Sequence, residues 1–177
     1  MSASRASRAF ARRARAIRLL ALDVDGVLTD GRLYYDPRGE ESKVFHVRDG
    51  VALVEAARAG LQVAVISGRA SVAVSRRMAE LGVREVHQGV EDKMAVLADL
   101  LRRFRLGSLE VAYMGDDLPD LRLLGAVGLA LTTANAVPEV KRVAHWVSRS
   151  PGGAGAVREA VEAILRARGT WPVAKAT

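Results

Sequence analysis

Short apolar runs that each end in polar residues constrain the fold of this chain more than any other feature. Three of them, residues 18–24, 61–66 and 109–114, have the length and the Val, Ile and Leu content of buried strands. Stretches with helical periodicity follow each run. Strands that alternate with helices predict a parallel sheet with helices on both faces, which is a doubly wound α/β fold. Such sheets place their chemistry beyond the carboxyl ends of the strands, so the polar residues there form the candidate site.

The remaining elements complete a single domain over residues 17–170. A β-hairpin is predicted after the first strand, with strands at 32–35 and 41–46 around a turn at 36–39. We call residues 32–46 the flap. The further expected strands are 84–87, 127–131 and 144–147, and the expected helices are 51–60, 71–81, 91–104, 118–124, 137–143 and 156–168.

The positive charge of the chain is concentrated at its amino end. The net charge is +7, and residues 1–18 carry six arginines and no acidic residue. We therefore expect a basic tail or helix over 1–16, and a nucleic-acid-binding module that uses it is an alternative function. An organelle transit peptide is another interpretation of this Ser- and Arg-rich segment. A short tail is expected over 171–177.

Composition narrows the chemistry further. The chain has no cysteine, which excludes a disulfide framework, a Cys-ligated metal centre and a cysteine nucleophile. No uncharged apolar run approaches the roughly 18 residues that a transmembrane helix needs. Aromatic residues are 5% of the chain, too few to predict stacking platforms for single-stranded nucleic acid. We therefore expect a cytoplasmic protein without a membrane segment.

Two pairs of aspartates follow two of the predicted strands. Asp23 and Asp25 are two residues apart in extended backbone, so their carboxylates share a face. Asp116 and Asp117 follow the strand at 109–114. Converging carboxylates repel each other unless a cation or a shared proton lies between them. An all-oxygen set of this kind favours Mg²⁺, which shares its remaining positions with water and phosphate.

Four motifs in matching order and spacing resemble the haloacid dehalogenase superfamily of phosphohydrolases. They are Asp23-Val24-Asp25-Gly26-Val27-Leu28-Thr29-Asp30, Ile66-Ser67-Gly68-Arg69, Lys93 and Gly115-Asp116-Asp117-Leu118-Pro119-Asp120. A narrower resemblance, over residues 17–165, is to the 3-deoxy-D-manno-octulosonate 8-phosphate phosphatase family. It rests on Phe45-His46-Val47-Arg48-Asp49-Gly50, Gln88-Gly89 with Asp92-Lys93, and Gly152-Gly153-Ala154-Gly155-Ala156-Val157-Arg158-Glu159.

The resemblance implies Mg²⁺-dependent hydrolysis of this keto-sugar phosphate to Kdo and phosphate, a step of lipopolysaccharide precursor synthesis. It implies that Asp23 attacks phosphorus to form an aspartyl-phosphate, while Asp25 protonates the leaving oxygen and then activates water. Asp23, Asp116 and the backbone carbonyl of Asp25 would hold Mg²⁺, and Asp117 and Asp120 would orient the site. A nine-carbon keto-sugar acid phosphate or another small phosphomonoester is the alternative substrate.

Other residues are implied to bind phosphate and sugar. Ser67 and the Gly68 amide would hold phosphate oxygens, and Lys93 would offset the charge of nucleophile and phosphate. The residues expected to bind substrate are His46, Val47, Arg48, Asp49, Gly50, Gly68, Arg69 and Arg77. Val54 and Ala154 stand where the family often has arginine, which leaves the preferred sugar open.

The spacing of the motifs leaves no room for a cap domain. Asp25 and Ser67 are 42 positions apart, which the flap and one helix fill, and Lys93 and Asp116 are 23 apart. The resemblance then implies a homotetramer in which hairpins of neighbouring subunits cover each site. It also implies that the glycine-rich segment 151–155 reaches a neighbour's site. A catalytically silent protein with this fold is the remaining alternative.

Overall fold

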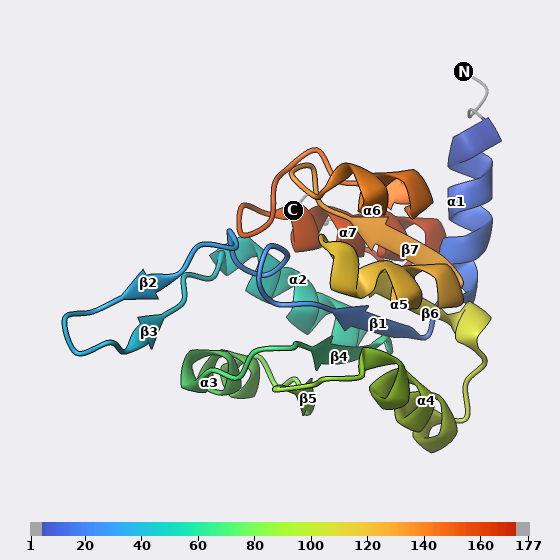
Figure 1. Cartoon of the computed structure of the whole chain (residues 1–177). Coiled ribbons are helices and arrows are strands. Elements are labelled where there is room, and N and C mark those ends of the chain that lie inside the picture. The colour runs from blue at the N-terminus through green and yellow to red at the C-terminus, as the bar shows by residue number, and fades with distance from the viewer. Residues whose placement is uncertain (1–4, 173–177) are drawn as a thin grey trace, which may run out of the picture.

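The main sheet has six strands, all parallel (Figure 1), in the computed structural model, which describes residues 5–172. The strands of this sheet are β1 (Leu19–Leu22), β4 (Gln62–Ile66), β5 (Glu85–His87), β6 (Val111–Met114), β7 (Leu129–Thr132) and β8 (Trp146–Val147). The helices are α1 (Arg5–Ala16), α2 (Val47–Arg58), α3 (Val72–Glu80), α4 (Lys93–Phe104), α5 (Leu121–Ala126), α6 (Pro138–Val143) and α7 (Ala156–Arg168), with 3-10 turns η1 (Ser108–Glu110) and η2 (Leu118–Asp120). The strand order is β5-β4-β1-β6-β7-β8. Predictions for residues 1–4 and 173–177 lie outside the described residues.

Helices cover both faces of the sheet (Figure 1). On β1, Leu20 and Leu22 lie in the core shared with α1, α2, α3 and α7, whereas Leu19 and Ala21 lie in the core shared with α4, α5 and α6. Successive side chains of a strand point to opposite faces, which explains this alternation. Each fully buried leucine stabilises the fold by about 1.5–3 kcal/mol. The prediction of a doubly wound α/β fold is confirmed, with β1 between β4 and β6 at the centre of the sheet.

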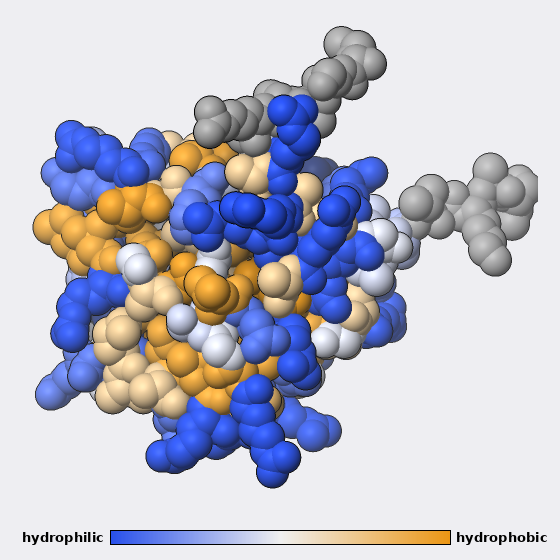
Figure 2. All heavy atoms as spheres, turned by 90° about the vertical axis from the view of Figure 1, so that its right-hand side faces the viewer, coloured by the Kyte–Doolittle hydropathy of each residue, from blue (hydrophilic) through white to orange (hydrophobic). Residues whose placement is uncertain are grey.

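The basic amino-terminal segment forms α1, which packs on α7 (Figure 1). Ala14 is fully buried in the core. Arg13 Nη1 donates to the carbonyl oxygen of Gly128 at 2.6 Å, and Arg15 Nε donates to that of Ala167 at 3.1 Å. Two arginines of the segment therefore hold the helix on the domain. Figure 2 shows this side of the molecule, opposite the carboxyl ends of the strands, where hydrophilic side chains surround smaller apolar areas.

The flap extends from the domain as an antiparallel hairpin of β2 (Tyr34–Tyr35) and β3 (Glu41–Ser42) (Figure 1). Its strands are shorter than predicted. The Asp36 carboxylate accepts the backbone N–H groups of Arg38 and Glu40 at 2.8 and 2.9 Å, so the turn is closed locally. In the described part of the chain no cap domain is inserted, as predicted. Among the same residues, no helix has the length and apolar character needed to cross a membrane.

Helix α2 begins earlier than the sequence predicts. His46 is its N-cap, and the side chain accepts the backbone N–H of Arg48 at 3.3 Å. Asp49 and Gly50 therefore lie inside the first turn, where both are buried. The prediction failed because an Asp-Gly pair is typical of turns, whereas histidine is not among the preferred capping residues.

Candidate active site

The polar residues that follow β1, β4 and β6 meet at one edge of the sheet, as the sequence predicts. They form a cavity of about 310 Å³, a size that suits a small ligand. The lining residues are Asp23, Asp25, Gly31, Ser67, Gly68, Arg69, Lys93, Asp116, Asp117, Pro119 and Asp120. The structure therefore brings together nine of the predicted site residues.

Lys93 lies between two carboxylates inside this cavity. It is the first residue of α4, and its Nζ lies 3.0 Å from Asp23 Oδ2 and donates to Asp120 Oδ1 at 2.8 Å. The hydroxyl of Tyr113 donates to the same Asp120 oxygen at 2.6 Å. Burial opposes the charge of Lys93, but Asp23 and Asp120 raise its pKa above the usual 10.5, so it remains a cation.

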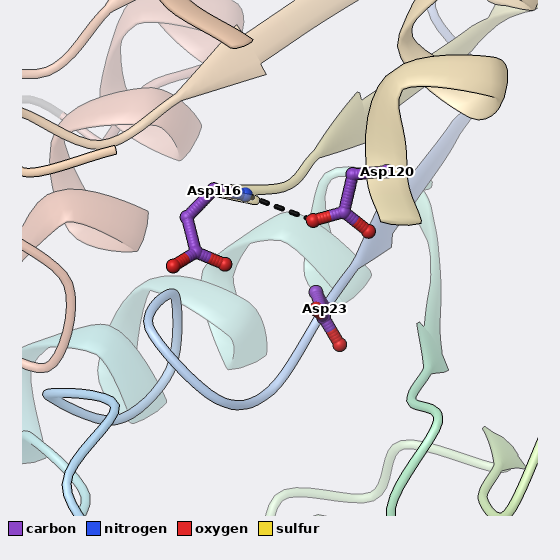
Figure 3. Close-up of side chains that lie close together, drawn as sticks. All are labelled: Asp23, Asp116 and Asp120. Carbon is purple, nitrogen blue, oxygen red and sulfur yellow. Dashed lines mark hydrogen bonds between the residues drawn. The ribbon is translucent and has the colours of Figure 1, made fainter. Parts of the chain in front are cut away.

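Asp120 holds the loop after β6 in place. Its buried Oδ2 accepts the backbone N–H groups of Asp116 at 2.9 Å and of Asp117 at 3.3 Å. Figure 3 shows the first of these bonds. A Cβ at Gly115 would lie 2.4 Å from Asp120 Cγ, so only glycine allows this approach. Both oxygens of Asp120 are thus occupied by hydrogen bonds, which is what an orienting residue requires.

Asp23, Asp116 and Asp120 converge on one point (Figure 3). Each offers a carboxylate oxygen, and the three oxygens lie within 4.8 Å of one another. Burial and the charge of Asp120 raise the pKa of Asp23 to about 6, against the opposing effect of Lys93. Burial and the charges of Asp23 and Asp120 raise the pKa of Asp116 to about 7. One lysine therefore does not balance the negative charge of the cluster.

The residues of the cluster fit Mg²⁺. They offer hard oxygen donors without cysteine or histidine, the set that this cation prefers. Burial and then the repulsion between carboxylates raise the pKa values of Asp23 and Asp116, and a bound cation would offset both effects. The loop after β1 is shaped for this approach, because a Cβ at Gly26 would lie 1.9 Å from Asp116 Oδ2. Asp120 is engaged through both oxygens in hydrogen bonds that hold the loop after β6, and ligation by Asp23 and Asp116 stays a prediction.

Ser67 and Gly68 lie in the wall of the cavity after β4. Ser67 is 2% exposed, its backbone N–H donates to the carbonyl of His87 at 2.9 Å, and its Oγ accepts the N–H of Arg69 at 3.3 Å. A Cβ at Gly68 would meet only the carbonyl oxygen of Val90, at 3.7 Å. The local backbone fixes both residues at the cavity, and the phosphate contacts that the resemblance implies for them stay a prediction.

Lys43 enters the site from the flap, and the sequence analysis did not identify it. Its Nζ donates to Asp25 Oδ1 at 2.5 Å and to Glu41 Oε1 at 3.3 Å. Arg69 Nη2 donates to the same Glu41 oxygen at 2.7 Å, and Arg69 Nε lies 3.7 Å from Asp25 Oδ2. The sequence signal was the spacing of Glu41 and Lys43, which are two residues apart in extended backbone and share a face.

The other residues expected to bind substrate lie outside this cavity, around the start of α2. His46 caps the helix, and Val47 and Arg48 in its first turn are exposed. A Cβ at Gly50 would lie 2.3 Å from Arg77 Nη2, so these two residues are in close contact. The structure thus groups them with one another and apart from Asp23, and their contact with substrate stays a prediction.

Asp49 has a different contact from the one expected. It is 2% exposed, and its Oδ1 accepts the backbone N–H of Arg158 at 2.7 Å. Burial raises the pKa of Asp49. Because Arg158 lies in the first turn of α7, this bond ties the starts of α2 and α7 together. In this structure Asp49 therefore does not line the cavity.

The glycine-rich segment 151–155 packs against its own chain, and its implied reach to a neighbour's site stays a prediction. The backbone N–H of Gly153 donates to the carbonyl of Val27 at 3.0 Å. A Cβ at Gly152 would lie 1.8 Å from the carbonyl oxygen of Gly26. In this structure the segment packs against the loop after β1.

Known proteins share these features. Residues 85–160 match the haloacid dehalogenase-like hydrolase family. Over 163 residues the chain is 43% identical to the 3-deoxy-D-manno-octulosonate 8-phosphate phosphatase of Escherichia coli K12, an alignment that covers 92% of this chain and 87% of that protein.

Solved structures are similar over almost the whole chain. A probable YrbI family phosphatase from Pseudomonas syringae has a TM-score of 0.90 at 46% identity, covering 92% of this chain and 93% of that one. The 3-deoxy-D-manno-octulosonate 8-phosphate phosphatase from Moraxella catarrhalis, solved with magnesium ion, phosphate ion and Kdo, has a TM-score of 0.88 at 38% identity, covering 90% and 92%. With such identity over most of both chains, this protein belongs to the 3-deoxy-D-manno-octulosonate 8-phosphate phosphatase family of haloacid dehalogenase-like hydrolases.

Proposed function

We propose that the protein hydrolyses 3-deoxy-D-manno-octulosonate 8-phosphate to Kdo and inorganic phosphate, as a cytoplasmic, Mg²⁺-dependent enzyme of lipopolysaccharide precursor synthesis. The observation that carries the proposal is the pairing of Asp23 with the buried cation of Lys93 in a cavity that also holds the acidic cluster. The substrate follows from the family, because the relatives named above are phosphatases for this sugar phosphate.

In the first half of the reaction Asp23 acts as the nucleophile. An anionic carboxylate must approach an anionic phosphate, so positive charge must offset the repulsion. Lys93 supplies one charge from 3.0 Å. Mg²⁺ held by Asp23, Asp116 and the backbone carbonyl of Asp25 would supply further charge beside the phosphoryl group. A bond forms between an Asp23 oxygen and phosphorus, the bond to the sugar oxygen breaks, and Asp25 gives that oxygen its proton.

In the second half Asp25 acts as a base. Its carboxylate takes a proton from water as the water oxygen attacks phosphorus, and the bond to Asp23 breaks to release phosphate. Ser67 and the Gly68 amide hold the phosphoryl oxygens during both steps. Asp120 acts indirectly: it accepts the backbone N–H groups of Asp116 and Asp117 and so holds the loop after β6.

The sugar needs its own contacts. Arg69 lines the cavity and is 46% exposed at its side chain, so its planar guanidinium can pair with a substrate carboxylate. The exposed Val47 and Arg48, together with His46 and Arg77, form the outer part of the proposed sugar site. These residues do not line the catalytic cavity, and no cap domain covers it among the described residues, so we infer that a closed site takes further protein surface.

We propose that this surface comes from neighbouring copies in a homotetramer. Exposed apolar side chains gather on the flap and on helix starts: Leu33 (49% exposed), Tyr35 (58%), Val44 (60%), Val47 (72%) and Val72 (85%). Contiguous exposed apolar surface is typical of interfaces, and three of these side chains, Leu33, Tyr35 and Val44, lie on the flap. A flap seated on a neighbour would exclude water from a site that has no cap. Light scattering should give the mass of four chains, and a fully active monomer would contradict the proposal.

Phosphate release across a substrate panel tests the proposed reaction. The panel contains eight- and nine-carbon keto-sugar phosphates, hexose phosphates and nucleotides, each with Mg²⁺ or with EDTA. We expect a strong preference for the eight-carbon substrate that EDTA and Asp23→Asn abolish. Asp99→Asn is the matched control, because Asp99 pairs only with surface arginines of α4 among the described residues. Preference for a nine-carbon substrate would change the sugar, and no turnover by the folded, Mg²⁺-loaded protein would refute the proposal.

A further inference from the structure

The flap contributes a buried cation to the site. We propose that Lys43 is a positioning residue for Asp25: it holds one carboxylate oxygen so that the other faces the leaving oxygen of the substrate. The inference rests on the proposed function, which gives Asp25 the acid–base role. It also gives the flap a part in the chemistry of its own subunit, in addition to covering a site.

Asp25, Lys43, Glu41 and Arg69 form a closed ring of alternating charge, which we call the charge ring. Lys43 Nζ joins Asp25 Oδ1 at 2.5 Å to Glu41 Oε1 at 3.3 Å. Arg69 joins the same two carboxylates from the other side, at 2.7 Å to Glu41 and at 3.7 Å to Asp25 Oδ2. Each group is therefore fixed by two partners, and the ring is neutral when Asp25 is ionised, as it is when it acts as the base.

Burial separates Lys43, Glu41 and Asp25 from ordinary surface ion pairs, whereas the Arg69 side chain of the ring is 46% exposed. The Lys43 side chain is 2% exposed, that of Glu41 14% and that of Asp25 22%. An ammonium removed from water is stable only where carboxylates replace its hydration. The Lys43 ammonium therefore needs the Asp25 carboxylate in place of water, and in turn Lys43 restrains Asp25. Exposed ion pairs, by contrast, contribute little to stability.

Asp23 and Asp25, the two carboxylates of the first motif, pair with different cations. Lys93 contacts Asp23, whereas Lys43 contacts Asp25, so each aspartate has its own cation. With Oδ1 held by Lys43, Asp25 retains Oδ2, which has only the longer 3.7 Å ion pair with Arg69 within the ring, for the leaving oxygen of the substrate. A proton donor must be held within about 0.5 Å of its productive position. Lys43 provides this restraint from the flap.

A positioning role predicts an effect that depends on the leaving group. A sugar alkoxide needs a proton as the P–O bond breaks, whereas 4-nitrophenolate leaves almost without one. In single-turnover measurements, Lys43→Met should slow cleavage of the keto-sugar phosphate by about 10²-fold and of 4-nitrophenyl phosphate by less than about threefold. A misfolded fraction would lower both rates by the same factor. The ratio of the keto-sugar phosphate rate to the 4-nitrophenyl phosphate rate therefore isolates the role of Asp25.

The cysteine-free chain allows a chemical rescue. Lys43→Cys introduces a single thiol, whose thiolate displaces bromide from 2-bromoethylamine to form a C–S bond and an ammonium at nearly the length of lysine. This product should regain most of the keto-sugar phosphate rate, while alkylation with iodoacetamide, which adds no charge, should not. Lys141→Cys, at an exposed position of α6, is the matched control and should keep the wild-type rate throughout.

The outcomes separate this inference from the proposed function. Equal losses for both esters, or no recovery with the ammonium side chain in a protein with a native circular dichroism spectrum, would overturn the role of Lys43. A wild-type protein that cleaves neither ester would instead refute the proposed function.

Discussion

The acidic cluster should make the metal-free protein less stable as pH rises. Folding raises the pKa of Asp116 from 3.8 to about 7, by burial and by the charges of Asp23 and Asp120, and the pKa of Asp23 from 3.8 to about 6. A carboxyl with a raised pKa binds more protons in the folded state than in the unfolded state between these values. The stability it contributes is therefore complete below pH 3.8 and is lost as pH rises through about 7.

Asp116 alone sets the size of the effect. One pKa unit corresponds to about 1.36 kcal/mol, so the rise from 3.8 to about 7 corresponds to about 4 kcal/mol. Of this, roughly 2.7 kcal/mol is lost between pH 5 and pH 8. Asp23 is left out because its repulsion with Asp116 would be counted twice. For a chain of this length each kcal/mol moves Tm by about 2–4 °C, so Tm should fall by roughly 5–11 °C over that range.

Thermal unfolding in EDTA and in Mg²⁺ between pH 5 and pH 8 measures this loss. Mg²⁺ should raise Tm more at pH 8 than at pH 5, because protons compete with the cation for the same oxygens. Asp116→Asn removes the buried charge and should raise the Tm of the metal-free protein at pH 8, while it abolishes stabilisation by Mg²⁺. Asp99, which pairs with surface arginines of α4, is the matched control, and Asp99→Asn should leave the pH dependence unchanged.

Two results would refute this reasoning. One is a metal-free Tm that stays constant or rises between pH 5 and pH 8. The other is an Asp116→Asn protein that is less stable than the wild type at pH 8 while Asp99→Asn is neutral. Burial lowers the pKa of His145, which acts in the opposite direction below pH 6.5, and comparison of the variants cancels this contribution.

Three further substitutions test the packing around the site. Gly26→Ala places a Cβ 1.9 Å from Asp116 Oδ2 and should weaken Mg²⁺ activation by about tenfold or more in a metal titration, whereas Gly39→Ala, also at positive φ but with open space, should not. Lys93→Met leaves two buried carboxylates without their cation, and denaturant unfolding at pH 8 should show a loss of about 3–5 kcal/mol together with loss of turnover. Arg13→Ala removes the bond to Gly128 and should speed hydrogen exchange in α1 without changing exchange in β1.

The features that the sequence predicts well are local ones. The helix at 156–168 has the same bounds in the structure, because Gly155 and Gly169 bracket it with positive φ. The strand at 18–24 is predicted too long, because the backbone leaves the sheet after Leu22 to carry Asp23 into the cavity. The polar ends of the strands still meet as predicted, since parallel topology brings them to one edge.

Lys43 and Asp49 show why the rest could not be predicted. Lys43 binds Asp25, 18 residues away, and Asp49 binds Arg158, 109 residues away. Pairings across the fold leave no periodic pattern in the sequence. The resemblance groups Asp49 with its neighbour Arg48, but one turn of helix directs one side chain into the core and the other to solvent.

The glycine-rich segment 151–155 indicates what sets the spacing of the metal site. Gly152 packs against the carbonyl of Gly26 so closely that a Cβ would lie 1.8 Å from it, and Gly26 in turn packs against Asp116. The backbone of the segment, the loop after β1 and the Asp116 side chain are thus in successive contact, with glycine at each junction. Close packing of this kind resists displacement. The position of the Asp116 carboxylate beside the loop that carries Asp23 therefore depends on close approaches at Gly152 and Gly26, so the glycines of two distant motifs meet one steric requirement.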